Sequence, residues 1–164
     1  LKVRLRVDGL SALAREMLAL AGQPDADVEA ALADGRAMDT WRAMIRAQDG
    51  DPDAALPTAR ETHTVTADRD GVLAEQLALP FGIAAWRLGA GRARAQDPVQ
   101  HAAGIDLHAK PGDEVRAGQP LFTLSADEPS RFERALSALD GAWRIDDAGT
   151  YEASGPLIRE RITA

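Results

Sequence analysis

The fold class is decided by the stretch Glu61-Thr-His-Thr-Val-Thr-Ala67, where the spacing of apolar side chains changes from helical to alternating. Its threonines would lie on one side of an extended chain and His63, with the apolar residues, on the other, which predicts a β-strand. Asp70-Gly71 is typical of a hairpin turn because glycine supplies a positive φ, so residues 72–77 are expected to return as the partner strand. His63 lies in the apolar register of this strand, and we expect it to be a hydrogen-bonded core histidine.

Upstream of this strand, residues 10–48 have the helical period. The first helix ends at Gly22, a second begins near Asp25 or Asp27 and closes at Gly35, and a third ends at Asp49. The apolar faces of the first and third helices are formed by Leu10, Leu13, Met17 and Leu20, and by Met38, Trp41, Met44 and Ile45.

A linker is indicated between the helical and the strand-forming parts. Residues 49–57 contain Pro52 and Pro57 and lack a helical or strand period. We therefore expect a helical segment over residues 1–57 and a C-terminal α+β domain over residues 58–164.

Downstream of residue 77 the pattern mixes short helices, turns and strands. A short helix is expected from Pro80, a loop from Gly89 to Gly104, strands at 105–108, 121–125 and 143–145, and a helix at 130–139. The predicted fold class is α+β: a helical lead-in followed by a small, mostly antiparallel β unit with two helices, resembling a barrel-sandwich hybrid.

Composition excludes several classes of function. The 164 residues carry 19 basic and 26 acidic side chains, a net charge of −7, which argues against non-specific nucleic-acid binding. Cysteine is absent, which removes disulfides and thiolate metal sites. No apolar run approaches the roughly 20 residues of a membrane helix. We expect a soluble, cytoplasmic protein that contacts neither nucleic acid nor membrane.

Two groups of residues invite a search for chemistry. His101, Asp106 and His108 contain the ligand types of a metal site, but their spacing matches no known ligand pattern, and we predict no metal or cofactor. The run Gly89-Ala-Gly-Arg-Ala-Arg94 lacks the Lys-Ser/Thr of a phosphate loop and follows a helix rather than a strand, so we favour a glycine-capped helix end. The residues alone give no catalytic or substrate-binding constellation.

Two stretches resemble a known family. Gly82-Ile-Ala-Ala-Trp-Arg-Leu-Gly-Ala-Gly-Arg-Ala-Arg-Ala-Gln-Asp-Pro98, with Gly104-Ile-Asp-Leu-His108 and Gly112-Asp-Glu-Val115, is similar to the C-terminal domain of thymidine and pyrimidine-nucleoside phosphorylases. Upstream, residues 30–37 and 41–52 resemble the helices that precede that domain. Residues 1–7 depart from the family pattern, since Leu5 stands where an acidic cation ligand is expected.

The resemblance implies a phosphorylating glycosyltransferase of pyrimidine nucleoside salvage, which converts a nucleoside and phosphate to free base and pentose 1-phosphate. Phosphate is then a co-substrate and no cofactor is implied. The family's phosphate and base sites lie upstream of this chain, so no catalytic residue is carried over and the chain alone is expected to be inactive. The helical segment would belong to the parent α/β domain. The implied partners are the rest of the parent enzyme and, through its N-terminal region, a second subunit.

The loop is the sequence's candidate for a functional role. Gly89, Gly91, Arg92 and Arg94 are predicted to form a loop that faces the substrate cleft of the whole enzyme. A rival interpretation starts from Lys110-Pro-Gly-Asp-Glu-Val115, which resembles the turn of lipoyl and biotinyl carrier domains. Lys110 begins the turn rather than standing at a hairpin tip, so a modified lysine is not supported, and a non-catalytic interaction module remains the alternative.

Overall fold

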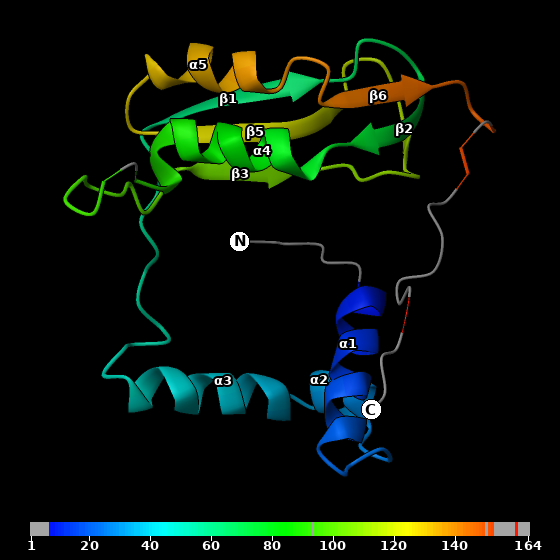
Figure 1. The fold of residues 1–164 in the computed structure, drawn as a ribbon, viewed down its shortest axis with the longest axis vertical. Coiled ribbons are helices and arrows are strands. Elements are labelled where there is room, and N and C mark those ends of the chain that lie inside the picture. The colour runs from blue at the N-terminus through cyan, green and yellow to red at the C-terminus, as the bar shows by residue number, and fades with distance from the viewer. Residues whose placement is uncertain (1–6, 93, 150, 153–159, 161–164) are drawn as a thin grey trace. The chain divides into compact units, whose positions relative to one another are not determined.

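Figure 1 shows the computed structural model, which describes residues 7–92, 94–149, 151–152 and 160. The chain divides into two compact units, one that contains the residues up to Ala55 and another that begins at Leu56. The described strands all lie in the second unit, together with two α-helices. The predicted α+β class is confirmed. Leu5, the departure noted above, lies outside the described residues.

The first unit consists of three helices, as the sequence predicts. They are α1 (Val7–Leu20), α2 (Val28–Ala33) and α3 (Arg36–Ala47). α1 ends where Gly22 adopts a φ of +75°, a conformation that glycine tolerates best. α2 begins at Asp27, whose Oδ1 accepts a hydrogen bond of 2.9 Å from the backbone N–H of Ala30.

The apolar faces of this unit are present but exposed. Leu13 and Met17 on α1 are 59% and 71% exposed, and Trp41 on α3 is 43% exposed. Val28 is the one buried hydrophobic side chain among the described residues of this unit. The helices therefore form without a sizeable core of their own.

The second unit contains two three-stranded sheets in which all pairings are antiparallel (Figure 1). The first sheet has the order β1-β5-β3 and the second the order β4-β2-β6. The strands are β1 (Glu61–Thr66), β2 (Gly71–Gln76), β3 (Gly104–Leu107), β4 (Glu114–Val115), β5 (Pro120–Ala126) and β6 (Trp143–Asp146).

The predicted hairpin between residues 61–67 and 72–77 is wrong. β1 pairs with β5, whereas β2 pairs with β4 and β6 in the other sheet. The glycine at position 71 is required for a different reason, since a Cβ there would lie 2.3 Å from the carbonyl oxygen of Asp146 on β6. The turn signal thus marks the place where the chain passes from one sheet to the other.

The expectation that His63 is a core histidine is also wrong, because its side chain is exposed. β1 is an edge strand of its sheet, and burial begins only further along it, at Val65 and Ala67. The His63 ring instead lies beside the Phe132 ring, with 5.9 Å between the centroids.

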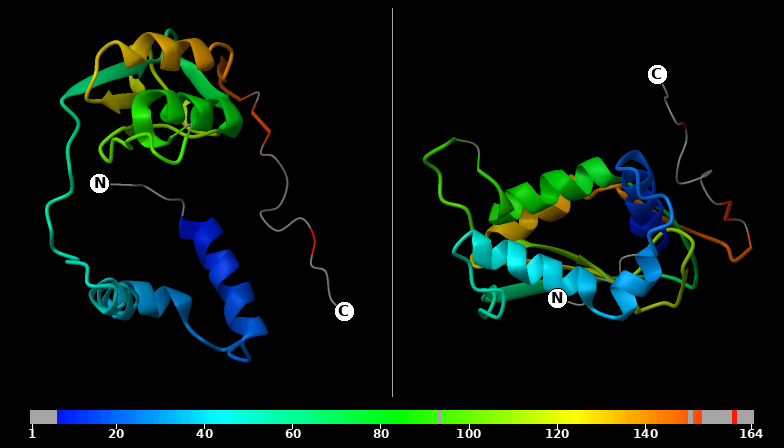
Figure 2. Two further views of the ribbon diagram at one scale, coloured as in Figure 1. Left: turned by 60° about the vertical axis from the view of Figure 1, so that its left-hand side comes forward. Right: turned by 90° about the horizontal axis from the view of Figure 1, so that it is seen from below.

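The core of the second unit is built around Phe122 on β5. The rings of Phe81 and Trp143 meet it edge-on, at centroid distances of 5.0 and 5.1 Å. Helices α4 (Ala78–Ala85) and α5 (Arg131–Ala138) pack against each other and lie next to each other in both views of Figure 2. The largest fully buried side chains are Phe122, Leu73, Leu88, Leu121, Leu124 and Leu139.

Candidate functional site

The candidate site begins where α4 ends. The helix continues as one wider turn, η1 (Trp86–Ala90), and leaves the helical conformation at Gly89, whose φ is +115°. The carbonyl of Gly89 accepts a hydrogen bond of 2.9 Å from the N–H of Gln100. A Cβ at Gly89 would lie 3.1 Å from the Gln100 side chain, so glycine suits both the conformation and the space. The predicted glycine-capped helix end is present.

Gly91 has a second steric role in this loop. A Cβ there would lie 2.9 Å from Cδ1 of Trp86, closer than carbon atoms pack. The backbone of the loop therefore runs directly against the indole ring.

The loop after Gly91 is closed by its own hydrogen bonds. Nη1 of Arg92 donates to the carbonyl of Ala95 at 2.9 Å. The N–H of Arg94 donates to Oδ2 of Asp97 at 2.9 Å, and the N–H of Asp97 donates to the carbonyl of Arg94 at 3.0 Å. These contacts fix the shape of the loop and use one nitrogen of the Arg92 guanidinium.

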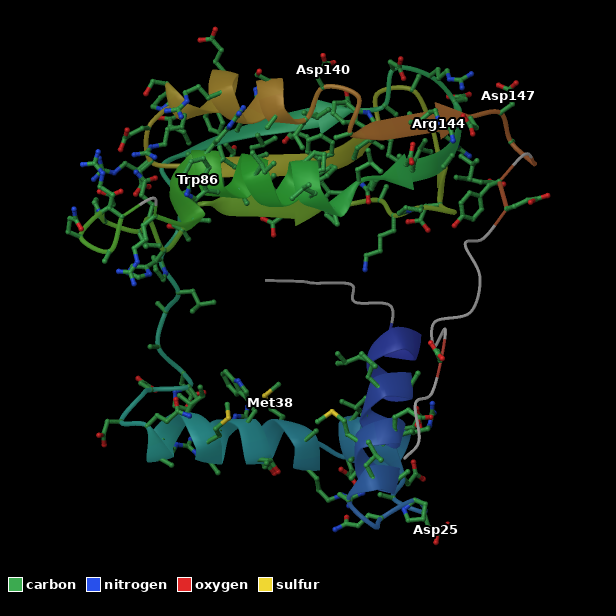
Figure 3. The ribbon with its side chains drawn as sticks, in the orientation of Figure 1. Asp25, Met38, Trp86, Asp140, Arg144 and Asp147 are labelled. Atoms are coloured by element: carbon green, nitrogen blue, oxygen red, sulfur yellow. The ribbon has the colours of Figure 1, made fainter. Side chains whose placement is uncertain are left out.

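Between this loop and α5 lies a cavity of about 330 Å³, which we call the arginine pocket. Four of its lining residues are arginines and one is an aspartate, an excess of three positive charges in a chain whose net charge is −7. Figure 3 shows side-chain nitrogens gathered near the labelled Trp86, at this end of the molecule. The lining residues are Trp86, Arg87, Gly91, Arg92, Asp97, Pro98, Arg131 and Arg134.

The arginines of the pocket are oriented by neighbours on α5 and by the turn before it. Nη1 of Arg87 donates to the carbonyl of Arg134 at 2.7 Å. Arg131 is held by Glu128, with Nε 3.1 Å from Oε2 and Nη2 donating to Oε1 at 3.1 Å. Oε1 of Glu128 also accepts a hydrogen bond of 2.8 Å from Nε2 of Gln100. The hydrogen bond from Arg131 is the main reason that the pKa of Glu128 lies below its usual value.

The sequence identified part of this site. Gly91 and Arg92 line the pocket, whereas Gly89 and Arg94 belong to the same segment but are absent from the lining. Arg87, Arg131 and Arg134 were missed. Arg131 and Arg134 are three residues apart at the start of a helix and therefore share a face, but only the packing of α5 against η1 aims that face at the loop.

The metal candidates do not come together as a site. Nε2 of His108 lies 2.8 Å from Oγ1 of Thr123, a hydrogen bond across the sheet. Among the described residues, no group of three His, Cys, Asp or Glu side chains is arranged to hold a metal ion.

The turn at Lys110 is held by its backbone and by Asp113. The N–H of Lys110 donates to Oδ2 of Asp113 at 2.9 Å, and the N–H of Asp113 donates back to the Lys110 carbonyl at 2.9 Å. Lys110 thus begins the Pro-Gly turn, as the sequence indicates. No helix within the described part of the chain is long and apolar enough to cross a membrane.

Comparison with known proteins places the pocket within a defined domain. Residues 72–146 match the family model described as the pyrimidine nucleoside phosphorylase C-terminal domain, and this range contains the whole arginine pocket. Thymidine phosphorylase of Mycobacterium tuberculosis is 45% identical over 150 residues, which cover 92% of this chain and 35% of that protein. Pyrimidine-nucleoside phosphorylase of Bacillus subtilis is 36% identical over 163 residues, covering 92% and 36% respectively. The chain spans about a third of the length of these curated relatives.

Proposed function

Since the chain corresponds to the C-terminal part of the thymidine and pyrimidine-nucleoside phosphorylase family, as its sequence predicts, we propose that it serves as that part of a pyrimidine-nucleoside phosphorylase. In the proposed reaction an oxygen of phosphate forms a bond to C1 of the sugar while the bond from that carbon to the base nitrogen breaks. The bonding electrons leave with the base, and the products are the free base and pentose 1-phosphate. This is a glycosyl transfer in nucleoside salvage, and we expect it in the cytoplasm.

The observation that carries the proposal is the agreement between the family match over residues 72–146 and the 45% identity over 150 residues. The family match covers the second unit from β2 to β6, and the identity extends to most of the chain. The range of the family match includes the loop and the helix end that the sequence analysis identified as candidates.

We further propose that this chain alone does not catalyse phosphorolysis. The hydroxyl of Thr123 lies 2.8 Å from Nε2 of His108, but it is also hydrogen-bonded to the Thr64 hydroxyl across the sheet, and the described contacts give this pair no third group that orients the imidazole. Catalysis of this kind depends on positioning phosphate against the sugar carbon, which requires groups from several parts of an enzyme. The test is to incubate the chain with thymidine or uridine and phosphate. Release of free base above a control without protein would contradict the proposal.

The rest of the parent enzyme is the proposed partner of the helical unit. Leu13, Met17 and Trp41 are exposed here, and exposed apolar faces of this kind usually mark an interface. The relatives are about three times as long as the matched region, so they contain enough additional chain to cover these faces. The second subunit implied by the family would join through its N-terminal region.

The loop that carries Gly89, Gly91, Arg92 and Arg94 is proposed to face the substrate cleft of the whole enzyme and to help hold its closed state. The hydrogen bond from Arg92 to the Ala95 carbonyl supports this role because it fixes the shape of the loop. In the full-length enzyme, Arg92→Ala is expected to lower kcat/KM with a nearly unchanged melting temperature. A lowered melting temperature with normal kinetics would mean a structural arginine, and no change in either quantity would make the loop a connector.

A further inference from the structure

The arginine pocket has a charge that the function proposed above does not use. The chain as a whole is acidic, yet four guanidinium groups from η1, the loop and α5 line one small cavity. Asp97 is the single carboxylate in the lining, and its Oδ2 already accepts the N–H of Arg94. Glu128, outside the lining, pairs with Arg131, whereas Arg87, Arg92 and Arg134 have no carboxylate partner among the described residues. Like charges repel at this range, so these three arginines stabilise the fold poorly unless an anion lies among them.

The guanidinium groups retain donors for such an anion. A guanidinium has five N–H donors, and the hydrogen bonds of Arg87 and Arg92 within the chain use one nitrogen each. Arg134 is exposed, and its side chain makes no hydrogen bond or ion pair with another described residue. Nε and Nη2 of Arg131 both lie 3.1 Å from carboxylate oxygens of Glu128. Arg131 therefore contributes mainly positive charge to the pocket, with fewer free N–H donors.

Three of the four guanidinium groups are held in place before any ligand arrives. The α5 backbone holds Arg87, the loop backbone holds Arg92, and Glu128 with Gln100 holds Arg131. Preorganised donors cost less side-chain entropy when they bind a ligand. The planar fork of each guanidinium matches the oxygen geometry of a phosphate, and several guanidinium groups that line one cavity favour a doubly charged anion over a single carboxylate.

One wall of the pocket has different chemistry. Trp86 is 44% exposed, and Gly91 and Pro98 complete an apolar wall beside the arginines. The cavity of about 330 Å³ is near the lower end of the range of small-molecule sites, roughly 300–1,000 Å³. A flat indole next to a cluster of guanidinium groups suits a ligand that carries an uncharged ring beside its anion.

We propose that the arginine pocket binds a small phosphate monoester, with the phosphate among Arg87, Arg92 and Arg134 and the uncharged ring against Trp86. The ring belongs to a sugar or to a nucleobase, and both ligands share the phosphate monoester chemistry. This binding does not depend on the phosphorolysis proposed above, because all of the residues involved lie in the second unit of the chain.

The test is calorimetric titration of the whole chain at low ionic strength with inorganic phosphate, ribose 5-phosphate and uridine 5′-monophosphate. The two esters are expected to bind more tightly than inorganic phosphate, and Trp86→Ala is expected to remove that preference. If the nucleotide binds more tightly than the sugar phosphate, the indole contacts the base. If the sugar phosphate binds more tightly, the indole contacts the sugar, and either order supports the proposal.

Arg134→Ala is the central variant, because its exposed side chain has no described partner to lose. It is expected to weaken ester binding about tenfold, the loss of one charge-assisted hydrogen-bonded contact, and Arg134→Lys is expected to recover part of that loss. Arg116→Ala removes the same charge from an exposed turn outside the pocket and is the matched control. Unchanged circular dichroism and melting temperature would show that both variants fold.

The proposal is overturned if none of the three probes binds at millimolar concentration. It is also overturned if Arg116→Ala weakens binding as much as Arg134→Ala, which would show general electrostatic attraction rather than a site. Equal binding of inorganic phosphate and both esters, unchanged by Trp86→Ala, would overturn the assignment of the ring to the indole wall.

Discussion

The helical unit up to Ala55 and the α+β unit from Leu56 both contain short helices with apolar side chains, but they bury apolar side chains to different degrees. In the second unit, α4 and α5 cover sheets whose inner side chains are inaccessible to water, such as Leu73 and Phe122. In the first unit the apolar faces of α1 and α3 are exposed. A helical period predicts which residues share a face, and burial requires a partner surface that the period does not describe.

The strongest test of this difference is to truncate one apolar side chain in each unit. Phe122→Ala removes a fully buried ring that two other aromatic rings contact, and we expect the free energy of unfolding to fall by about 3–5 kcal/mol. Leu13→Ala in the same chain removes an exposed side chain, and the change is expected to stay within about 0.5 kcal/mol. Urea denaturation followed by circular dichroism measures both. Equal losses would mean that the units do not differ in packing.

The second test asks whether the first unit's exposed faces are covered in a longer protein. If the rest of the parent enzyme packs on α1, Leu13→Ala in the full-length enzyme is expected to cost about 2–4 kcal/mol, because the side chain is then buried. The same substitution in the present chain supplies the control, since there the residue is 59% exposed. A full-length enzyme that tolerates the change without a lower melting temperature would contradict the proposed contact.

The boundary between the units provides a third test. We expect limited proteolysis to cut first between residues 49 and 60, because the segment contains Pro52 and Pro57 and lies outside the described helices and strands. Mass spectrometry of the first fragments identifies the site. Early cutting within residues 62–77, which include most of β1 and all of β2, would place the weak point inside the second unit instead.

The smallest expected effect concerns one exposed ion pair in each unit. The pKa of Glu128 is lowered chiefly by its hydrogen bond from Arg131, and that of Glu29 by its hydrogen bond from Arg15. A carboxyl whose folded pKa is depressed stabilises the fold above its unfolded pKa and loses that contribution as the pH falls through the folded value. Both contributions are therefore present at pH 6–7 and disappear as the pH falls below the ordinary glutamate value of 4.5.

Glu128→Gln and Glu29→Gln measure these contributions. Each variant is expected to be slightly less stable than the original chain at pH 7, and the difference should vanish in acid. Thermal unfolding at a series of pH values gives the comparison. A difference that persists unchanged at low pH would show that the pairs act through packing rather than charge.

Features of the fold that depend on contacts between neighbouring residues could be predicted from the sequence, whereas features that depend on distant contacts could not. The ends of α1 and α2 follow from Gly22 and Asp27, because a cap uses groups within a few residues. The departure from the helical conformation at Gly89 was predicted for the same reason. The partner of β1 was predicted wrongly, because β5 lies about 60 residues away and the nearby turn signal favoured β2.

The candidate site shows the same difference between local and distant contacts. Its loop was identified from the sequence because glycines and arginines stand close together between Gly89 and Arg94. Arg131 and Arg134 join that loop only through the packing of α5 against α4 and η1. The sequence by itself thus predicted the five α-helices, five of the six described strands and the resemblance to the family, because period, caps and motifs depend on neighbouring residues. The tertiary structure alone decided which strands pair and that four arginines share one pocket, since both depend on free energies of packing between segments far apart in the chain.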